Sequence, residues 1–176
     1  MKAVCLFFTL FVFEFILVLN ASGQNYDYYP LKEFKGDTVA FYKKNFWSCM
    51  RYEDKNFNTF FEDFEKDLPI RTAIFFLDLS GESVTNIFFF AEPKEKVEAE
   101  LKKNGRYYGI ATNIRYLLYK NNDPAFFYKI ASWGFGKFLD MTDEIREEMH
   151  DKEVGGIWYD FLDLNYYLRH RDEKPK

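Results

Sequence analysis

The sequence predicts a mainly β protein, an antiparallel up-and-down β-barrel followed by one C-terminal helix. Three observations favour this fold. Aromatic residues make up 22% of the 176 residues, and aromatic and β-branched residues favour pleated, half-buried surfaces. Several runs of such residues are separated by short turns of the kind that join hairpin strands. One of these turns, Asn104-Gly105, is a strong hairpin signal, because both central residues of a type I′ turn need a positive φ.

The first 23 residues have the pattern of a secretory signal peptide. A basic start precedes an apolar run from Ala3 to Leu19, and Ala21 and Gly23 suit the small-residue positions of a cleavage site. We therefore expect residues 1–23 to be removed and the mature protein to be secreted and extracellular, with no membrane segment. An uncleaved membrane anchor is the alternative, but the run is short for a span and contains Glu14.

The rest of the chain predicts one barrel domain at 24–164 and a polar C-terminal tail at 165–176. The formal net charge is -4, and lysine and arginine are scattered among acidic residues. This balance argues against nucleic-acid binding, which needs a basic face. Cys49 is the only cysteine left after removal of the signal peptide. It is a buried thiol, a reactive thiol or an intermolecular bridge, and the sequence leaves all three open.

The N-terminal half of the domain predicts strands around one helix. Short strands are expected at 38–42 and 46–52. A stripe of phenylalanines three or four residues apart then predicts a helix over 57–68, where Pro69 disfavours continuation. Two β-rich runs around Gly81 predict a hairpin, with strands at 71–79 and 83–91.

The segment Lys94–Lys103 fits either a strand or a helix. Pro93 at its start and the Glu98–Lys102 pair favour a helix. Alternation of apolar and charged residues favours a strand. Because hairpins are expected on both sides, we interpret the segment as a strand that turns back at Asn104-Gly105. A helix here would imply an α+β fold instead.

The C-terminal half is expected to complete the barrel. Strands are predicted at 106–119 and 125–131, joined by a turn that contains Pro124, and the chain continues extended over 133–139. A helix then begins near Thr142, and either Asp140 or Thr142 can cap it. Residues 157–162 form a last strand or a second short helix.

Candidate catalytic groups are few. The two histidines, His150 and His170, both lie late in the chain in charged segments, where a solvated surface role is the simplest interpretation. Neither belongs to a compact metal-ligand spacing, and nothing beyond residue type supports a pair with Cys49. We therefore expect no enzyme activity, no metal and no cofactor.

A closed barrel can instead enclose one small ligand. In each predicted strand, alternate residues form one face that is more apolar than the other. We take one candidate residue from the more apolar face of each of four strands. Tyrosine on an inward face also brings a hydroxyl group into an apolar space, which suits the orientation of a ligand. The candidate ligand-binding residues are Phe75, Phe88, Tyr116 and Tyr128. Core packing is the alternative for each of them.

With its strands laid out in this way, the chain resembles a lipocalin. Besides the element order, the segment 119–128 is similar to the polar turn and aromatic strand of that family, and the helix 142–153 resembles the helix beside the barrel. Thr38 stands where the family's Gly-x-Trp pattern has Trp, Asn122-Asp123-Pro124 replaces the family's usual turn, and Cys49 alone cannot form the family's paired disulfides. Divergent arthropod salivary lipocalins also lack Gly-x-Trp and are the nearest subgroup.

The resemblance implies a secreted protein that sequesters a small hydrophobic or amphipathic ligand, such as an amine or a lipid mediator, in a barrel pocket. The competing hypothesis is a secreted interaction or effector protein with an α+β fold. In that case an aromatic surface binds another protein and there is no small ligand.

Overall fold

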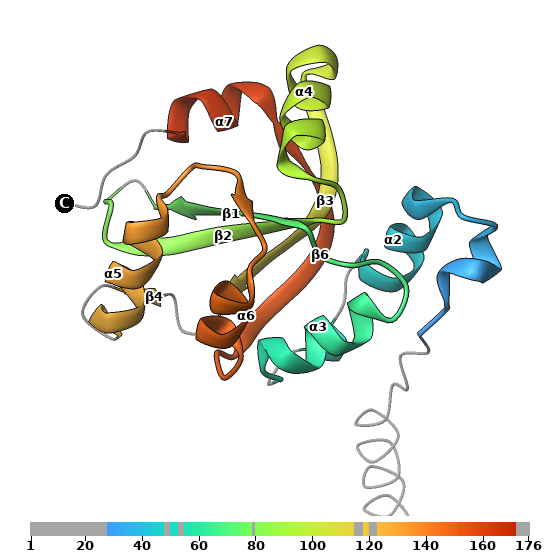
Figure 1. Ribbon diagram of the computed structural model, residues 1–176, viewed down its shortest axis with the longest axis horizontal. Coiled ribbons are helices and arrows are strands. Elements are labelled where there is room, and N and C mark those ends of the chain that lie inside the picture. The colour runs from blue at the N-terminus through green and yellow to red at the C-terminus, as the bar shows by residue number, and fades with distance from the viewer. Residues whose placement is uncertain are drawn as a thin grey trace, which may run out of the picture.

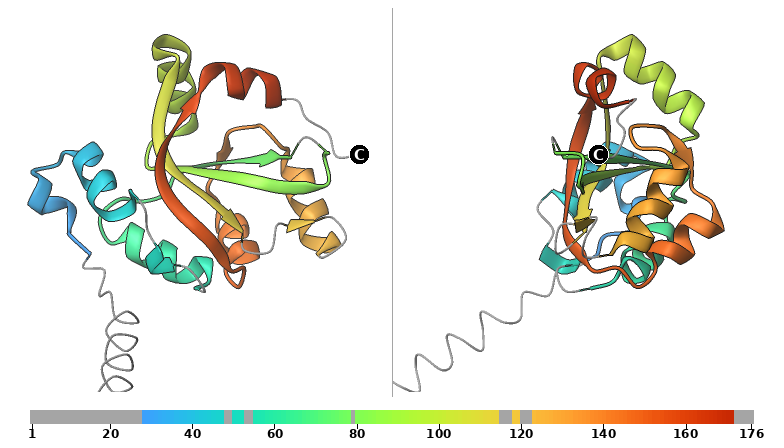
Figure 2. Two further views of the ribbon diagram at one scale, coloured as in Figure 1. Left: turned by 180° about the vertical axis from the view of Figure 1, so that it is seen from behind. Right: turned by 90° about the vertical axis from the view of Figure 1, so that its left-hand side faces the viewer.

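The computed structural model describes residues 28–47, 50–52, 55–78, 80–114, 118–119 and 123–171. These residues form an α+β fold in which helices cover both faces of an open antiparallel sheet (Figures 1 and 2). The strand order is β5-β1-β2-β3-β6, and β4 pairs with β2. The prediction of a mainly β, lipocalin-like barrel is therefore wrong, because this sheet does not close on itself. The α+β alternative describes the fold.

Four longer strands make the body of the sheet: β1 (Thr72–Leu77), β2 (Ser83–Phe90), β3 (Arg106–Ile114) and β6 (Val154–Asp163). β1 and β2 form the hairpin that the sequence predicts, which confirms that expectation. β3 and β6 are distant in sequence but pair along their whole length. Two strands of two residues each extend the sheet. β4 (Leu118–Tyr119) pairs with β2, and β5 (Leu139–Asp140) pairs with β1.

Six α-helices and two 3-10 turns of the described chain surround this sheet: η1 (Leu31–Phe34), α2 (Thr38–Phe46), η2 (Met50–Tyr52), α3 (Phe57–Glu65), α4 (Lys94–Asn104), α5 (Pro124–Trp133), α6 (Asp143–Met149) and α7 (Leu164–His170). Five of the α-helices begin with a polar side chain that accepts a hydrogen bond from a first-turn backbone amide. These N-cap residues are Asp37, Asn56, Asp123, Thr142 and Asp163.

Two apolar clusters lie on opposite faces of the sheet. The larger one packs α2, α3, α5 and α6 on one face, and the smaller one packs α4 and α7 on the other. Side chains of β1 alternate between them, so that Phe75 belongs to the larger cluster and Ile74 and Phe76 to the smaller. All six residues of β1 are consequently buried. This explains the continuous apolar run from Ala73 to Leu77.

Asn104-Gly105 ends a helix and does not form the predicted hairpin turn. Gly105 has a φ of 74° at the C-terminal cap of α4, and its amide donates to the Leu101 carbonyl at 2.9 Å. Val97 and Leu101, four residues apart, are the buried positions of α4. A glycine with positive φ serves both a helix cap and a type I′ turn, so the dipeptide alone does not distinguish them. The helix propensity of the preceding segment decided the outcome.

Three other predicted strands or extended segments are also corrected. Residues 38–42 belong to α2, residues 50–52 form a 3-10 turn, and residues 125–131 belong to α5. Asp123 and Pro124, interpreted above as turn residues, are the N-cap and first residue of α5. The expected extended segment 133–139 begins at the end of α5 and reaches β5.

The predicted helices α3 and α6 are confirmed, and residues 157–162 lie in a strand, β6. The segment predicted as a polar tail begins with α7, whose Tyr167 is buried. The predicted signal peptide and Cys49 lie outside the described residues. Within the described ranges, no helix is long and apolar enough to cross a membrane.

Candidate functional site

The structure does not bring the predicted ligand-binding residues together. Phe75 of β1 is fully buried in the larger cluster, whereas Phe88 of β2 belongs to the smaller cluster on the opposite face of the sheet. Tyr128 lies on α5 with 52% of its surface exposed. Tyr116 lies outside the described residues. An open sheet between Phe75 and Phe88 leaves no barrel lumen for them to share.

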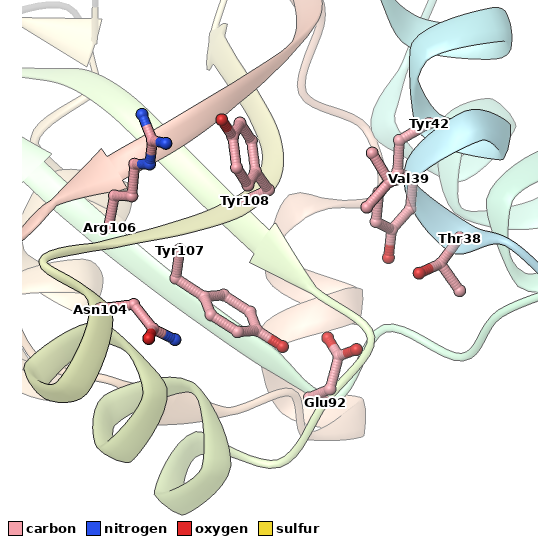
Figure 3. Close-up of a pocket in the computed structure, with 8 residues that line it drawn as sticks. All are labelled: Thr38, Val39, Tyr42, Glu92, Asn104, Arg106, Tyr107 and Tyr108. Carbon is pink, nitrogen blue, oxygen red and sulfur yellow. The ribbon is translucent and has the colours of Figure 1, made fainter.

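A different site is a cleft of about 290 Å³ between the start of α2 and the start of β3 (Figure 3). We call it the tyrosine cleft. Its walls come from α2, the segment after β2, the end of α4 and β3: Thr38, Val39, Tyr42, Glu92, Asn104, Arg106, Tyr107 and Tyr108. None of these residues is among the predicted site residues. The volume is near the lower limit of small-molecule sites, roughly 300 Å³.

The cleft exists because β3 extends beyond the end of β2. Pairing between β2 and β3 covers only Ile87 to Phe89 on β2, whereas β3 and β6 remain paired as far as Arg106. The paired register ends at Ile110, and at the next residue, Gly109, an added Cβ would lie 2.6 Å from the Phe90 ring and 2.8 Å from the Phe89 carbonyl oxygen. Glycine therefore allows the close approach of β2 to β3 beside the cleft.

Tyr42 and Tyr107 reach the cleft from opposite sides and both lie near Glu92. Tyr42 is 4% exposed and stacks on Phe64 with ring centroids 5.9 Å apart. The Tyr107 hydroxyl points toward the Glu92 carboxylate in Figure 3. Burial raises the pKa of both tyrosines, and the Glu92 charge raises each pKa further. Both side chains are therefore neutral phenols at physiological pH.

A third tyrosine, Tyr159 of β6, lies next to the cleft in the larger cluster. Its ring stacks on Tyr108 at 5.2 Å and lies 5.9 Å from the Tyr42 ring. Burial, the Tyr108 side chain and the Asp37 carboxylate raise the pKa of Tyr159 to about 12. The Tyr159 hydroxyl is buried and forms no hydrogen bond within the described part of the chain. The Tyr159 hydroxyl can therefore still form a hydrogen bond, and the Tyr159 ring lies beside the rings of Tyr42 and Tyr108, which line the cleft.

Beside the cleft is an exposed surface that we call the aromatic face, made of Val39, Arg106, Tyr108 and Phe161. Tyr108 and Phe161 are directly opposite each other in the β3–β6 ladder, with ring centroids 5.8 Å apart. The Arg106 guanidinium lies 5.9 Å from each ring centroid. Val39, Tyr108 and Phe161 are 42%, 37% and 42% exposed.

The exposure of this face follows from the length of the β3–β6 ladder. The next pair of residues on the same face, Ile110 and Tyr159, is buried in the larger cluster with 1% and 7% exposure. One step further along the ladder, the helices no longer cover the strands. Sequence reasoning missed these residues. Tyr107-Tyr108 was available as a signal, since adjacent strand residues point to opposite faces.

The histidines do not form part of the cleft. His150 pairs with Asp151 at an exposed position, and His170 stacks on Tyr166 at 4.1 Å. In the part of the chain that the structure describes, no group of three or more histidine, cysteine or acidic residues is placed to hold a metal ion.

Comparison of the chain with protein-family models, curated proteins and solved structures finds no match. The features that characterise this protein are its α+β fold with an open antiparallel sheet, and the aromatic face that lies beside the tyrosine cleft.

Proposed function

We propose that this chain is a secreted protein that binds another protein through the aromatic face. The observation that carries the proposal is the exposed cross-strand pair of Tyr108 and Phe161, with Arg106 over both rings. The signal-peptide pattern of residues 1–23 supports secretion. The predicted barrel pocket has no counterpart in the open sheet.

The chemistry of the aromatic face suits a protein partner. Aromatic residues and arginine are enriched at the centres of protein interfaces, and tyrosine and arginine frequently dominate the binding energy. Trp47, the C-cap residue of α2, is a further large apolar side chain with 66% of its surface exposed.

The aromatic face is also held in place before any partner arrives. Tyr108 and Phe161 belong to a ladder that runs from Arg106–Asp163 to Ile114–Val154, and Tyr108 rests on the buried Tyr159 ring. Side chains that are already ordered lose little conformational entropy on binding. A rigid strand pair is therefore a better support for an interface than an exposed side chain on an isolated helix end.

The test uses the mature chain with a photo-crosslinking residue at Val39, incubated with extracellular fluid of the source organism. The crosslinked protein is identified, purified and titrated against Phe161→Ala. We expect the Kd to rise at least about tenfold, which corresponds to about 1.4 kcal/mol. Leu168→Ala is the control, because Leu168 on α7 is 45% exposed and Phe161 is 42% exposed; it should leave the Kd unchanged.

Two results would contradict the proposal. One is the same Kd for Phe161→Ala and the unmodified chain. The other is a crosslink yield at Val39 no higher than at Tyr128, which is exposed on α5.

A further inference from the structure

The Glu92 carboxylate in the tyrosine cleft has no cationic partner within the part of the chain that the structure describes. Among the described residues, no lysine or arginine forms an ion pair with it, and Lys94, two residues later, pairs with Asp140 instead. Arg106 also lines the cleft, but its guanidinium lies over the Tyr108 and Phe161 rings. The backbone at Glu92 is fixed, because the buried Thr72 hydroxyl donates to the Glu92 carbonyl oxygen at 2.7 Å.

The surroundings of Glu92 suit a cation. In Figure 3 the hydroxyl groups are the parts of the Tyr42 and Tyr107 side chains nearest the Glu92 carboxylate, and phenol oxygens can accept hydrogen bonds from an ammonium group. Raised pKa values keep both phenols neutral, so neither adds a charge of its own. An anion entering the cleft would instead meet the Glu92 charge.

The carboxylate geometry favours an ammonium group over a guanidinium group. The Tyr107 hydroxyl already points toward the Glu92 carboxylate in Figure 3. The phenol occupies the space on one side of the carboxylate, so a bidentate pair with a planar guanidinium is obstructed. An ammonium group is a compact charge that needs only one carboxylate oxygen. The cleft volume of about 290 Å³ also accommodates a four-carbon stem.

The cleft and the aromatic face are continuous, since Val39, Arg106 and Tyr108 belong to both. A protein lying on the aromatic face therefore covers the mouth of the cleft. We infer that the tyrosine cleft receives a lysine side chain of that partner, with the ammonium group beside the Glu92 carboxylate and the tyrosine hydroxyl groups. This inference rests on the proposed function and names the chemistry of the partner at its centre.

The first experiment is an NMR titration of the mature chain with two small probes. Nα-acetyl-lysine methylamide carries the ammonium group, and Nα-acetyl-norleucine methylamide has a similar stem without it. We expect the lysine probe to shift the tyrosine ring signals and to bind at least tenfold more tightly than the norleucine probe. Equal binding of the two probes would overturn the inference.

The second experiment compares two charge-removing variants of similar shape. Glu92→Gln should weaken binding of the lysine probe at least fivefold. Glu95→Gln, on the exposed first turn of α4, removes the same charge outside the cleft and should leave it unchanged. Equal effects of the two variants, or none, would overturn the inference. If Glu92→Gln disturbs the spectrum of the free protein, the comparison of probes on the unmodified chain decides alone.

A free amine is distinguished from a lysine side chain by n-butylammonium, which lacks the amide groups of the lysine probe. Tighter binding of n-butylammonium would overturn the assignment to a protein lysine. Once the crosslinked partner is identified, its binding to two variants distinguishes failure of this inference from failure of the proposed function. Loss of partner binding in Phe161→Ala but not in Glu92→Gln overturns this inference and leaves the proposed function standing. Unchanged binding in both variants overturns both.

Discussion

The two ends of the sheet differ in what covers them. At the β1–β2 hairpin, helices pack on both faces, and every residue of β1 is buried. At the far end of the β3–β6 ladder, α4 and α7 cover one face (Figure 2), while Tyr108 and Phe161 on the other face are exposed. Both ends are rich in aromatic side chains. The same residue types therefore stabilise the fold in one region and form a surface in the other.

This difference explains why aromatic content alone did not locate the site. In the hairpin, aromatic rings pack against one another; for example, the Phe89 ring lies 5.7 Å from both the Phe60 and Phe61 rings. In the ladder, Tyr159 continues this packing and Tyr108 lies over it. The boundary between core and surface thus falls between two neighbouring residues on one face of β3–β6. We expect mutations on its two sides to have very different consequences.

The largest expected effect is the loss of a core ring. Phe89→Ala removes a fully buried side chain, and buried Phe→Ala changes cost about 3–5 kcal/mol of unfolding free energy. Phe161→Ala, at the exposed end, should cost less than about 1 kcal/mol. Urea denaturation of both variants measures the difference. Similar losses would show that the aromatic face belongs to the core.

A mutation at the junction between the two regions should lower the unfolding free energy by less than the loss of a core ring, but still measurably. Gly109→Ala places a Cβ against the Phe90 ring and the Phe89 carbonyl oxygen, so the end of β2 must shift. Overpacking of this kind costs about 1–3 kcal/mol. Thermal denaturation provides the measurement, with Gly105→Asn as the control. A Cβ at Gly105 meets nothing within 4 Å, and asparagine tolerates its positive φ. A stable Gly109→Ala variant would mean that the strands can separate freely beside the cleft.

The sequence predicted the parts of the fold that depend on local pattern. The β1–β2 hairpin and α3 follow from runs of apolar residues with a clear period. The errors arose where one residue type serves two structures. Asp123 and Pro124 suit a turn as well as the start of a helix, and Gly105 suits a hairpin as well as a helix cap.

The candidate site could not be predicted from local pattern, because it depends on the register between distant strands. Tyr108 is exposed and Ile110 is buried because the helices of the larger cluster cover the β3–β6 ladder at the Ile110–Tyr159 pair but not at the Tyr108–Phe161 pair. Glu92 reaches the cleft only because α4 returns the chain to β3. None of these relations is visible within a window of a few residues. The four predicted residues instead followed from a barrel geometry that the chain does not adopt.

The smallest expected effect lies at the boundary itself, in the hydroxyl group of Tyr159. Tyr159→Phe removes a buried hydroxyl that forms no hydrogen bond within the described residues. Loss of an unsatisfied polar group is neutral or stabilising, by up to about 1 kcal/mol. Tyr108→Phe, on the exposed neighbour, is the matched control and should leave stability unchanged.

The pH dependence of stability at alkaline pH is a second test of whether the Tyr159 hydroxyl belongs to the core. The pKa of Tyr159 is raised to about 12 in the folded protein, whereas an unfolded tyrosine has a pKa of about 10. The folded state therefore binds this proton more tightly. The resulting stabilisation is complete below about pH 10 and is lost as the pH rises through the folded pKa. Over this window, Tyr159→Phe should lose less unfolding free energy than the unmodified chain, as measured by urea denaturation at several pH values. Parallel losses would show that the Tyr159 hydroxyl already titrates as a solvated group, and the boundary between core and surface would then lie one residue pair deeper in the ladder.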